Sequence, residues 1–224
     1  MRHVKVKVCG ITSEEDLNMV CSMGADAVGF VVGVPSSPRN LTVEKAEKLI
    51  KLVPLFVKSV LVVVPHDESE VLNYYKRLKP DIIQIHGEKP FDAGFLKKKL
   101  FGTPLVRAVN MKSEELLNSA LQESKFFDAV LADSSSSDKY GGTGLIHDWS
   151  VSKRVREAIH PKPLILAGGL NPENVQEAIK AVKPYAVDVS TGVESKLGVK
   201  DFEKVAAFIR NAKALTIEDD WASA

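Results

Sequence analysis

Cysteine is scarce in this chain of 224 residues, which has Cys9, Cys21 and no CxxC pair. This scarcity argues against a disulfide framework or a zinc site and fits a reducing, cytoplasmic location. The sequence also lacks an excess of charge of one sign, because its formal net charge is +1. No global field therefore points to nucleic acid or to an acidic membrane as a partner. Long apolar runs are absent as well, which argues against a membrane span and a signal peptide.

No GxGxxG motif follows the first strand-like segment, which disfavours a doubly wound, dinucleotide-binding sheet. Instead, strand-like and helix-like segments alternate from end to end. The predicted strands cover residues 3–9, 27–32, 57–64, 81–86, 104–109, 128–132, 163–167 and 185–190. The predicted helices cover residues 14–23, 42–52, 67–78, 91–100, 113–122, 149–159, 172–182 and 200–211. These eight β-then-α units predict an α/β fold, a single-domain (β/α)8 TIM barrel over residues 1–211, with a polar C-terminal tail over residues 212–224.

The first predicted strand ends in a cysteine. Apolar and polar residues alternate along it with the period of two that is typical of a strand: Val4, Val6 and Val8 against Lys5, Lys7 and Cys9. Cys9 therefore lies on the face opposite the valines, at the carboxyl end of the strand, where active-site residues of parallel α/β proteins gather. Cys21 lies at helical spacing among apolar neighbours, and we interpret it as a small buried hydrophobe.

Glycines and small hydroxyl residues occupy the last three βα loops. Glycine lets backbone N–H groups approach an anion, and barrels often bind phosphate after strands seven and eight. A single glycine loop is more simply explained as a tight turn, but three loops converging on one side favour a phosphorylated substrate. The candidate phosphate-binding residues are Gly142, Gly144, Gly168, Gly169, Ser190, Thr191 and Gly192.

Asp133 ends the sixth predicted strand, far around the ring from Cys9. A thiolate is a competent base and a carboxylic acid with a raised pKa is a competent proton donor, so the two can act across a bound small molecule. Lys7 shares the inward face with Cys9, and Asp188 lies on strand eight, which adjoins strand one in a closed barrel. Neither charge tolerates unpaired burial, so we expect a Lys7–Asp188 ion pair beneath Cys9.

Two further residues are candidates for contact with a ligand. Arg39 follows Pro38 in the second loop, where a guanidinium can bind a carboxylate bidentately; a solvated surface arginine is the alternative. His86 closes the fourth strand with no carboxylate at matching spacing. We interpret His86 as a structural or substrate-contacting histidine rather than a metal ligand, and we expect neither a metal nor a cofactor.

Six short motifs occur in order along the chain, in register with the predicted barrel. They are KVCGIT (7–12), SPR (37–39), QIHG (84–87), Asp133 with GGTG (141–144), LAGGLNPENV (166–175) and VDVSTGVE (187–194). Through them the chain resembles the phosphoribosylanthranilate isomerase family of tryptophan biosynthesis over residues 3–211.

The resemblance implies a cofactor-free Amadori rearrangement of N-(5-phosphoribosyl)anthranilate to 1-(2-carboxyphenylamino)-1-deoxyribulose 5-phosphate. It makes Asp133 the general acid that opens the furanose ring and Cys9 the base that removes the C2′ proton. Arg39 would hold the anthranilate carboxylate, and loops six to eight would hold the phosphate. Lys7, His86 and Asp188 would lie near the ribose. The expected partner is a phosphorylated small molecule, bound by a monomer or homodimer, with no nucleic acid and no membrane.

Two other functions remain open from the residues alone. One is a different phosphosugar barrel, such as a ribulose-phosphate epimerase-like enzyme, which needs histidine metal ligands beside paired acidic groups. The second strand, which ends at residues 30–33 (FVVG), offers no such ligand. The other is a non-catalytic phosphate-binding barrel, which would be indifferent to the loss of Cys9.

Overall fold

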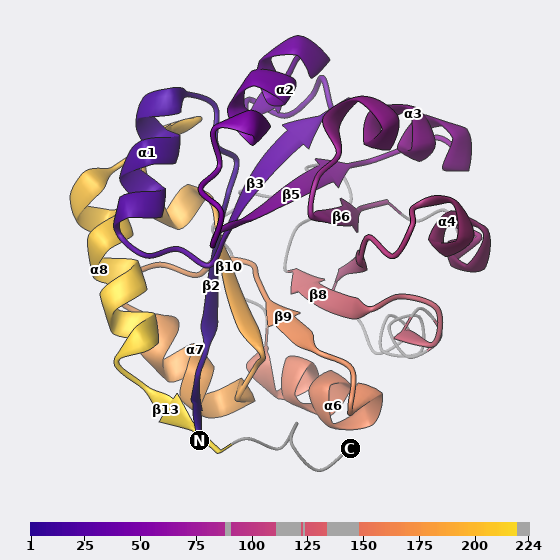
Figure 1. Cartoon of the computed structure of the whole chain (residues 1–224). Coiled ribbons are helices and arrows are strands. Elements are labelled where there is room, and N and C mark those ends of the chain that lie inside the picture. Colours follow the sequence, from indigo (N-terminus) through magenta and orange to yellow (C-terminus); the bar gives the residue numbers. More distant parts are fainter. Residues whose placement is uncertain (88–90, 111–121, 123, 134–147, 219–224) are drawn as a thin grey trace.

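Eight parallel strands form the centre of the molecule in the computed structural model, which describes residues 1–87, 91–110, 122, 124–133 and 148–218. The strands are β2 (Lys5–Cys9), β3 (Ala27–Val32), β5 (Lys58–Val63), β6 (Ile82–Ile85), β7 (Leu105–Asn110), β8 (Ala129–Asp133), β9 (Leu164–Leu166) and β10 (Ala186–Val189). Their order is β2-β10-β9-β8-β7-β6-β5-β3, and a β2–β3 pairing closes the ring (Figure 1). The predicted (β/α)8 barrel is confirmed.

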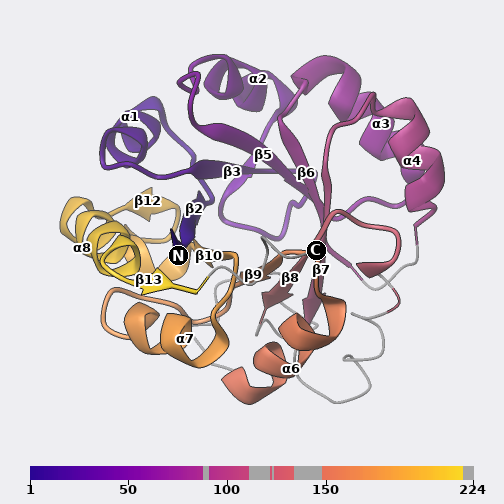
Figure 2. The same ribbon diagram turned by 60° about the horizontal axis from the view of Figure 1, so that its bottom comes forward.

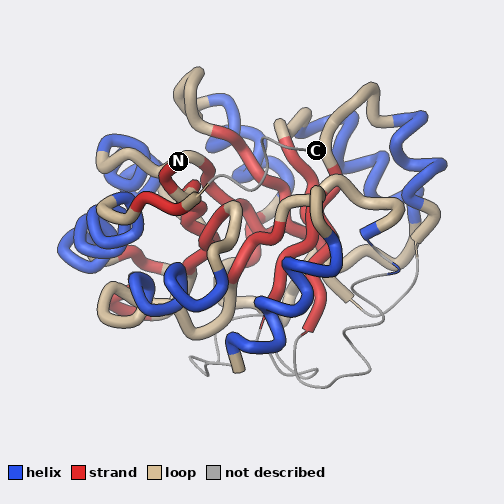
Figure 3. The backbone as a smooth tube through the Cα atoms, turned by 90° about the horizontal axis from the view of Figure 1, so that it is seen from below, coloured by secondary structure: helices blue, strands red, loops and turns tan. Residues whose placement is uncertain are grey.

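Helices surround the strands on the outside (Figure 3). They are α1 (Glu14–Ser22), α2 (Val43–Lys51), α3 (Glu68–Leu78), α4 (Ala93–Lys99), α6 (Trp149–Ile159), α7 (Val175–Val182) and α8 (Phe202–Lys213). Side chains cap many of their N-termini; Thr42 accepts from Lys45 N and Asp148 from Ser150 N. None of the helices in the described part of the chain has the length and apolar character needed to cross a bilayer.

The start of α7 differs from its prediction. Asn171 and Pro172 are typical of a helix N-terminus, yet α7 begins at Val175. The Asn171 side chain instead accepts hydrogen bonds from the backbone N–H groups of Glu173 and Asn174, at 3.0 and 2.9 Å. These residues therefore form a turn that ends the seventh βα loop. The predicted helix over 113–122 lies almost wholly outside the described residues.

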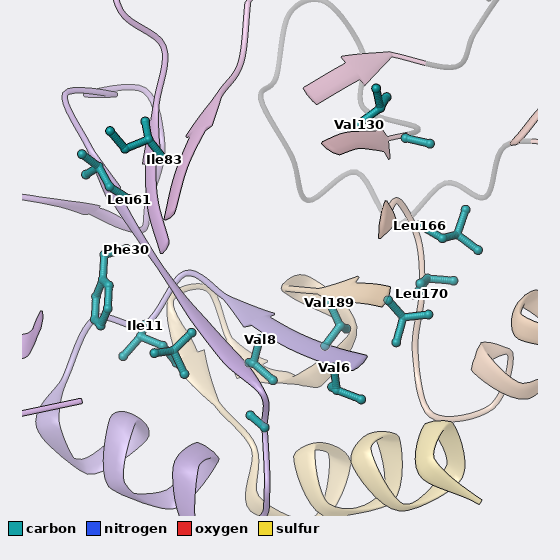
Figure 4. Close-up of a cluster of buried hydrophobic side chains, with 14 of the residues drawn as sticks. Val6, Val8, Ile11, Phe30, Leu61, Ile83, Val130, Leu166, Leu170 and Val189 are labelled. Atoms are coloured by element: carbon teal, nitrogen blue, oxygen red, sulfur yellow. The ribbon is translucent and has the colours of Figure 1, made fainter. Parts of the chain in front are cut away.

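The barrel has an outer apolar layer and a partly polar interior. Val6 and Val8 of β2 are fully buried in the cluster between the strands and the helices (Figure 4). The alternate residues Lys7 and Cys9 point the other way, into the barrel. The period of two in the first strand thus separates structural side chains from candidate catalytic ones.

Residues 212–217, which the sequence assigns to the polar C-terminal tail, include the end of a helix and a short strand. The helix α8 continues to Lys213, and β13 (Thr216–Ile217) pairs antiparallel with β1 (Arg2–His3) (Figure 2). Ile217 is buried there, which makes the pairing favourable. Other short elements also escaped the sequence analysis: β4 (Asn40–Leu41), the 3-10 helix η1 (Thr191–Val193), β11 (Glu194–Lys196) and β12 (Val199–Lys200).

Candidate active site

A cavity opens at the carboxyl ends of the strands, where a barrel places its chemistry. Ten of the predicted site residues line it: Cys9, Arg39, His86, Asp133, Gly168, Gly169, Asp188, Ser190, Thr191 and Gly192. Lys7 lies one layer deeper in the barrel. Gly142 and Gly144 fall outside the described residues. Four valines form an apolar wall of the same cavity: Val31, Val34, Val62 and Val64.

Cys9 sits at the end of β2 above a buried ion pair. The register of β2 and β10 places Lys7 opposite Asp188, and Lys7 Nζ lies 2.9 Å from Asp188 Oδ2. The expected pair beneath Cys9 is therefore present. Neighbouring Gly29 on β3 makes room for the sulfur, because a Cβ there would lie 2.8 Å from Cys9 Sγ.

Cys9, Lys7 and Asp188 shift one another's pKa values. Burial raises the pKa of the Cys9 thiol, and the nearby Lys7 charge only partly opposes this rise. Burial likewise raises the pKa of Asp188 against the opposing charge of Lys7. Burial alone lowers the pKa of Lys7, but Asp188 and Cys9 more than offset it and the pKa is raised. Burial therefore favours the thiol form of Cys9, and the adjacent Lys7 charge favours the thiolate.

Asp133 reaches the cavity from another side. It is the last residue of β8, which is three positions from β2 around the ring, and it is 8% exposed. Cys9 and Asp133 both line the cavity. A small molecule bound there therefore meets a thiol and a carboxyl group on different sides.

Arg39 is held in a fixed orientation. Its Nε donates to Glu194 Oε1 at 2.7 Å and its Nη2 to Glu194 Oε2 at 2.6 Å, so one edge of the guanidinium is paired bidentately. Nη2 also donates to Thr191 Oγ1 at 3.0 Å. Gly10 has φ 79° and lies directly against the side chain, since a Cβ there would overlap Arg39 Cδ. The solvated arginine considered as an alternative is excluded, because Arg39 is 5% exposed.

The sequence analysis missed the role of Glu194 and did not single out Lys200. The Lys200 side chain is completely buried; its Nζ donates to Cys9 O at 2.7 Å and to Glu194 Oε1 at 3.0 Å. Burial raises the pKa of Glu194, but Arg39 and Lys200 outweigh it, and the net pKa is lowered. Glu194 belongs to the VDVSTGVE motif and was therefore within reach of sequence analysis, whereas Lys200 stands in a two-residue strand without any pattern.

Glycines and small hydroxyl residues line much of the cavity after β9 and β10. Gly168 and Gly169 have φ of 82° and 65°, a region that favours glycine. Asn174 Nδ2 donates to Gly169 O at 2.9 Å and fixes this loop. Ser190 precedes η1, whose first turn also lines the cavity. Glycine-rich loops of this kind are suited to an anion, because glycine lets backbone N–H groups approach it.

His86 is neutral in this site. Burial, together with the Lys7 and Arg107 charges, lowers its pKa to about 3. Gln84 Nε2 lies 2.6 Å from His86 Nε2, so the neutral ring accepts a hydrogen bond there. Among the described residues, no three His, Cys, Asp or Glu side chains come together as a metal site would require.

Comparisons with known proteins agree on one group of enzymes. A sequence model of the family described as N-(5'phosphoribosyl)anthranilate (PRA) isomerase matches residues 6–211. The N-(5'-phosphoribosyl)anthranilate isomerase of Methanosarcina acetivorans is 41% identical over 223 residues, which cover 93% of each chain. The crystal structure of phosphoribosyl anthranilate isomerase from Thermotoga maritima has a TM-score of 0.83 and 39% identity, covering 95% of this chain and 100% of that one. Another crystal structure, in complex with reduced 1-(o-carboxyphenylamino)-1-deoxyribulose 5-phosphate, has a TM-score of 0.79 and 37% identity, covering 95% and 100% of the two chains.

Proposed function

The chain belongs to the N-(5'-phosphoribosyl)anthranilate isomerase family of tryptophan biosynthesis, and from this premise we propose its reaction and the roles of its residues. The substrate is N-(5-phosphoribosyl)anthranilate, and the product of the Amadori rearrangement is 1-(2-carboxyphenylamino)-1-deoxyribulose 5-phosphate. The observation that carries the residue roles is the placement of Cys9 and Asp133 on different sides of one cavity.

The reaction moves protons between named atoms. Asp133 protonates the furanose ring oxygen, the bond from that oxygen to C1′ breaks, and a Schiff base forms with the anthranilate nitrogen. Cys9, as the thiolate, then removes the proton from C2′ and gives an enolamine. The enolamine tautomerises to the ketone. Since burial favours the thiol form, Cys9 is a base whose proton must first leave, and Lys7 is the nearby charge that favours the thiolate.

The rest of the cavity suits the remaining parts of this substrate. The four-valine wall offers an apolar surface to the aromatic ring, and Arg39 offers its Nη1 to the anthranilate carboxylate. The loops with Gly168, Gly169, Ser190, Thr191 and Gly192 take the phosphate. Asp188 Oδ1 has no hydrogen-bond partner in the part of the chain that the structure describes, so it can accept a bond from a ribose hydroxyl.

Turnover of phosphoribosylanthranilate, generated in place in the presence of a chelator, tests this proposal. We expect the wild type to form the aminoketose and Cys9→Ala and Asp133→Asn to lose about 10²–10⁴-fold in kcat. Cys21→Ala is the matched control, because Cys21 lies on α1 outside the cavity. A folded wild type without turnover would contradict the activity, and near-normal kcat in either variant would contradict the residue's role.

A further inference from the structure

The hairpin β11–β12 after the last barrel strand carries an acidic and a basic side chain into the molecule. Glu194 and Lys200, whose side chains are 3% and 0% exposed, pair at 3.0 Å. The tip of the hairpin is tied to the first βα loop, because Thr12 Oγ1 donates to Gly198 O at 2.7 Å. Neither side chain touches the cavity, so their burial serves something other than direct contact with a ligand.

Glu194 occupies one edge of Arg39. An arginine side chain has many rotamers, and its position is costly to fix unless a partner matches its planar fork. Glu194 supplies that partner, with one oxygen on Nε and the other on Nη2. The hydrogen bonds of Arg39 within the described part of the chain use Nε and Nη2 and leave Nη1 without a partner, while Arg39 as a whole lines the cavity.

Lys200 also pairs with Glu194, so the Arg39–Glu194 ion pair is not isolated. Because Lys200 Nζ donates to the same oxygen of Glu194 as Arg39 Nε does, one carboxylate is shared between two cations. The positive charge of Arg39 is therefore not cancelled and remains available to an anion in the cavity. Lys200 Nζ also donates to Cys9 O at 2.7 Å and to Ser190 O at 3.3 Å. One ammonium thus joins the ends of the strands that carry the proposed base and the proposed phosphate loop.

We propose that Glu194 and Lys200 are positioning residues: Glu194 aims the Nη1 edge of Arg39 at the substrate carboxylate, and Lys200 shares the Glu194 carboxylate, so that Glu194 does not neutralise Arg39, while also fixing the backbone of Cys9. The proposal rests on the assignment of the carboxylate to Arg39. It makes the hairpin a determinant of specificity for an aromatic acid over the corresponding aromatic amine.

Binding of two reduced product analogues tests the proposal. One is reduced 1-(o-carboxyphenylamino)-1-deoxyribulose 5-phosphate, and the other is the same compound without its carboxyl group. We expect Glu194→Gln to weaken binding of the first by about 10- to 100-fold, since a hydrogen-bonded charged group is lost, and to change binding of the second by less than about threefold. Glu203→Gln, an exposed position on α8, is the matched control.

A double-mutant cycle shows whether Glu194 acts through Arg39. In an Arg39→Met background, Glu194→Gln should have no further effect on the carboxylate analogue. Additive effects, or an equal loss for both analogues, would overturn the proposal. Glu194→Asp, which keeps the charge but cannot span both nitrogens, provides a second variant if Glu194→Gln does not fold, and it should show the same selective loss.

Kinetics separates the two residues. Glu194 variants should raise KM with kcat nearly unchanged, because the carboxylate is bound equally in the ground state and the transition state. Lys200→Met should also lower kcat, since it frees the backbone of Cys9; unchanged kcat would overturn its role. Absence of wild-type turnover would instead refute the proposed function, so the two failures are distinguishable.

Discussion

Lys7→Met gives a direct measure of the energetics beneath the proposed base. Lys7 and Asp188 have side chains that are 6% and 9% exposed and pair at 2.9 Å. Removing the ammonium leaves a carboxylate in the barrel interior, where taking up a proton costs less than staying ionised. Protonating an aspartate of ordinary pKa near 3.9 at pH 7 costs about 4 kcal/mol, which sets a ceiling. That ceiling falls within the about 3–5 kcal/mol expected when one partner of a buried pair is removed.

The loss should depend on pH in a defined direction. Burial already raises the pKa of Asp188, and losing Lys7 removes the charge that opposes this rise. The folded variant then holds a proton that the unfolded chain has released, so its stability falls by about 1.4 kcal/mol for each pH unit above about 4. The ceiling on the deficit relative to wild type should therefore shrink to about 1.5 kcal/mol at pH 5. The raised pKa of Lys7 itself contributes stability that is lost only above its ordinary pKa of 10.5, outside this window.

Urea unfolding of wild type, Lys7→Met and Lys7→Met/Asp188→Asn at pH 5, 6 and 7 measures these quantities. The double variant has no unpaired charge and should recover most of the loss at pH 7. Lys5→Met is the control from the same strand: its ion pair with Asp26 is exposed and should be worth less than about 1 kcal/mol. A deficit equal at pH 5 and pH 7, or one that persists in the double variant, would refute the reasoning.

Two other predictions concern Cys9 and Arg39. In a Cys21→Ser background, alkylation of Cys9 by iodoacetamide, followed by mass spectrometry, should accelerate through pH 7 to 9 without levelling off, because burial raises the pKa of this thiol. A plateau below pH 8 would mean that the thiolate is the resting form. Gly10→Ala should lower stability by about 1–2 kcal/mol, the cost of a left-handed conformation for a residue with a Cβ, and should raise KM by displacing Arg39. An unchanged KM, measured by steady-state turnover, would show that Arg39 is not held from this side.

Much of the site follows from local pattern combined with closure of the barrel. The alternation in the first strand predicts that Lys7 and Cys9 share the interior face, because strand side chains alternate. A closed ring makes the first and eighth strands neighbours, and from this the Lys7–Asp188 pair could be predicted before any coordinates.

Other features depend on burial and on long-range contacts that no local pattern encodes. The raised pKa of Cys9 follows from its burial in the barrel, which a sequence does not give. Lys200 donates hydrogen bonds to backbone carbonyl oxygens. Because every residue type has the same carbonyl group, no sequence pattern identifies these partners. The start of α7 was misplaced because the Asn171 side chain accepts bonds from a turn rather than from a helix; the local signal was real, but two conformations satisfy it.

Closure of the barrel also sets the stage of chain synthesis at which the site is complete. Lys7 is separated by 181 residues from Asp188, and Cys9 by 191 from Lys200. Chains fold as they are synthesised, and contacts between distant residues form late. A nascent chain that has reached β9 already carries Cys9 and Asp133, but neither the carboxylate beneath the thiol nor the ammonium behind it. Enzymatic activity should therefore appear only after the hairpin β11–β12 has left the ribosome. Chains truncated before this hairpin should be inactive rather than partly active.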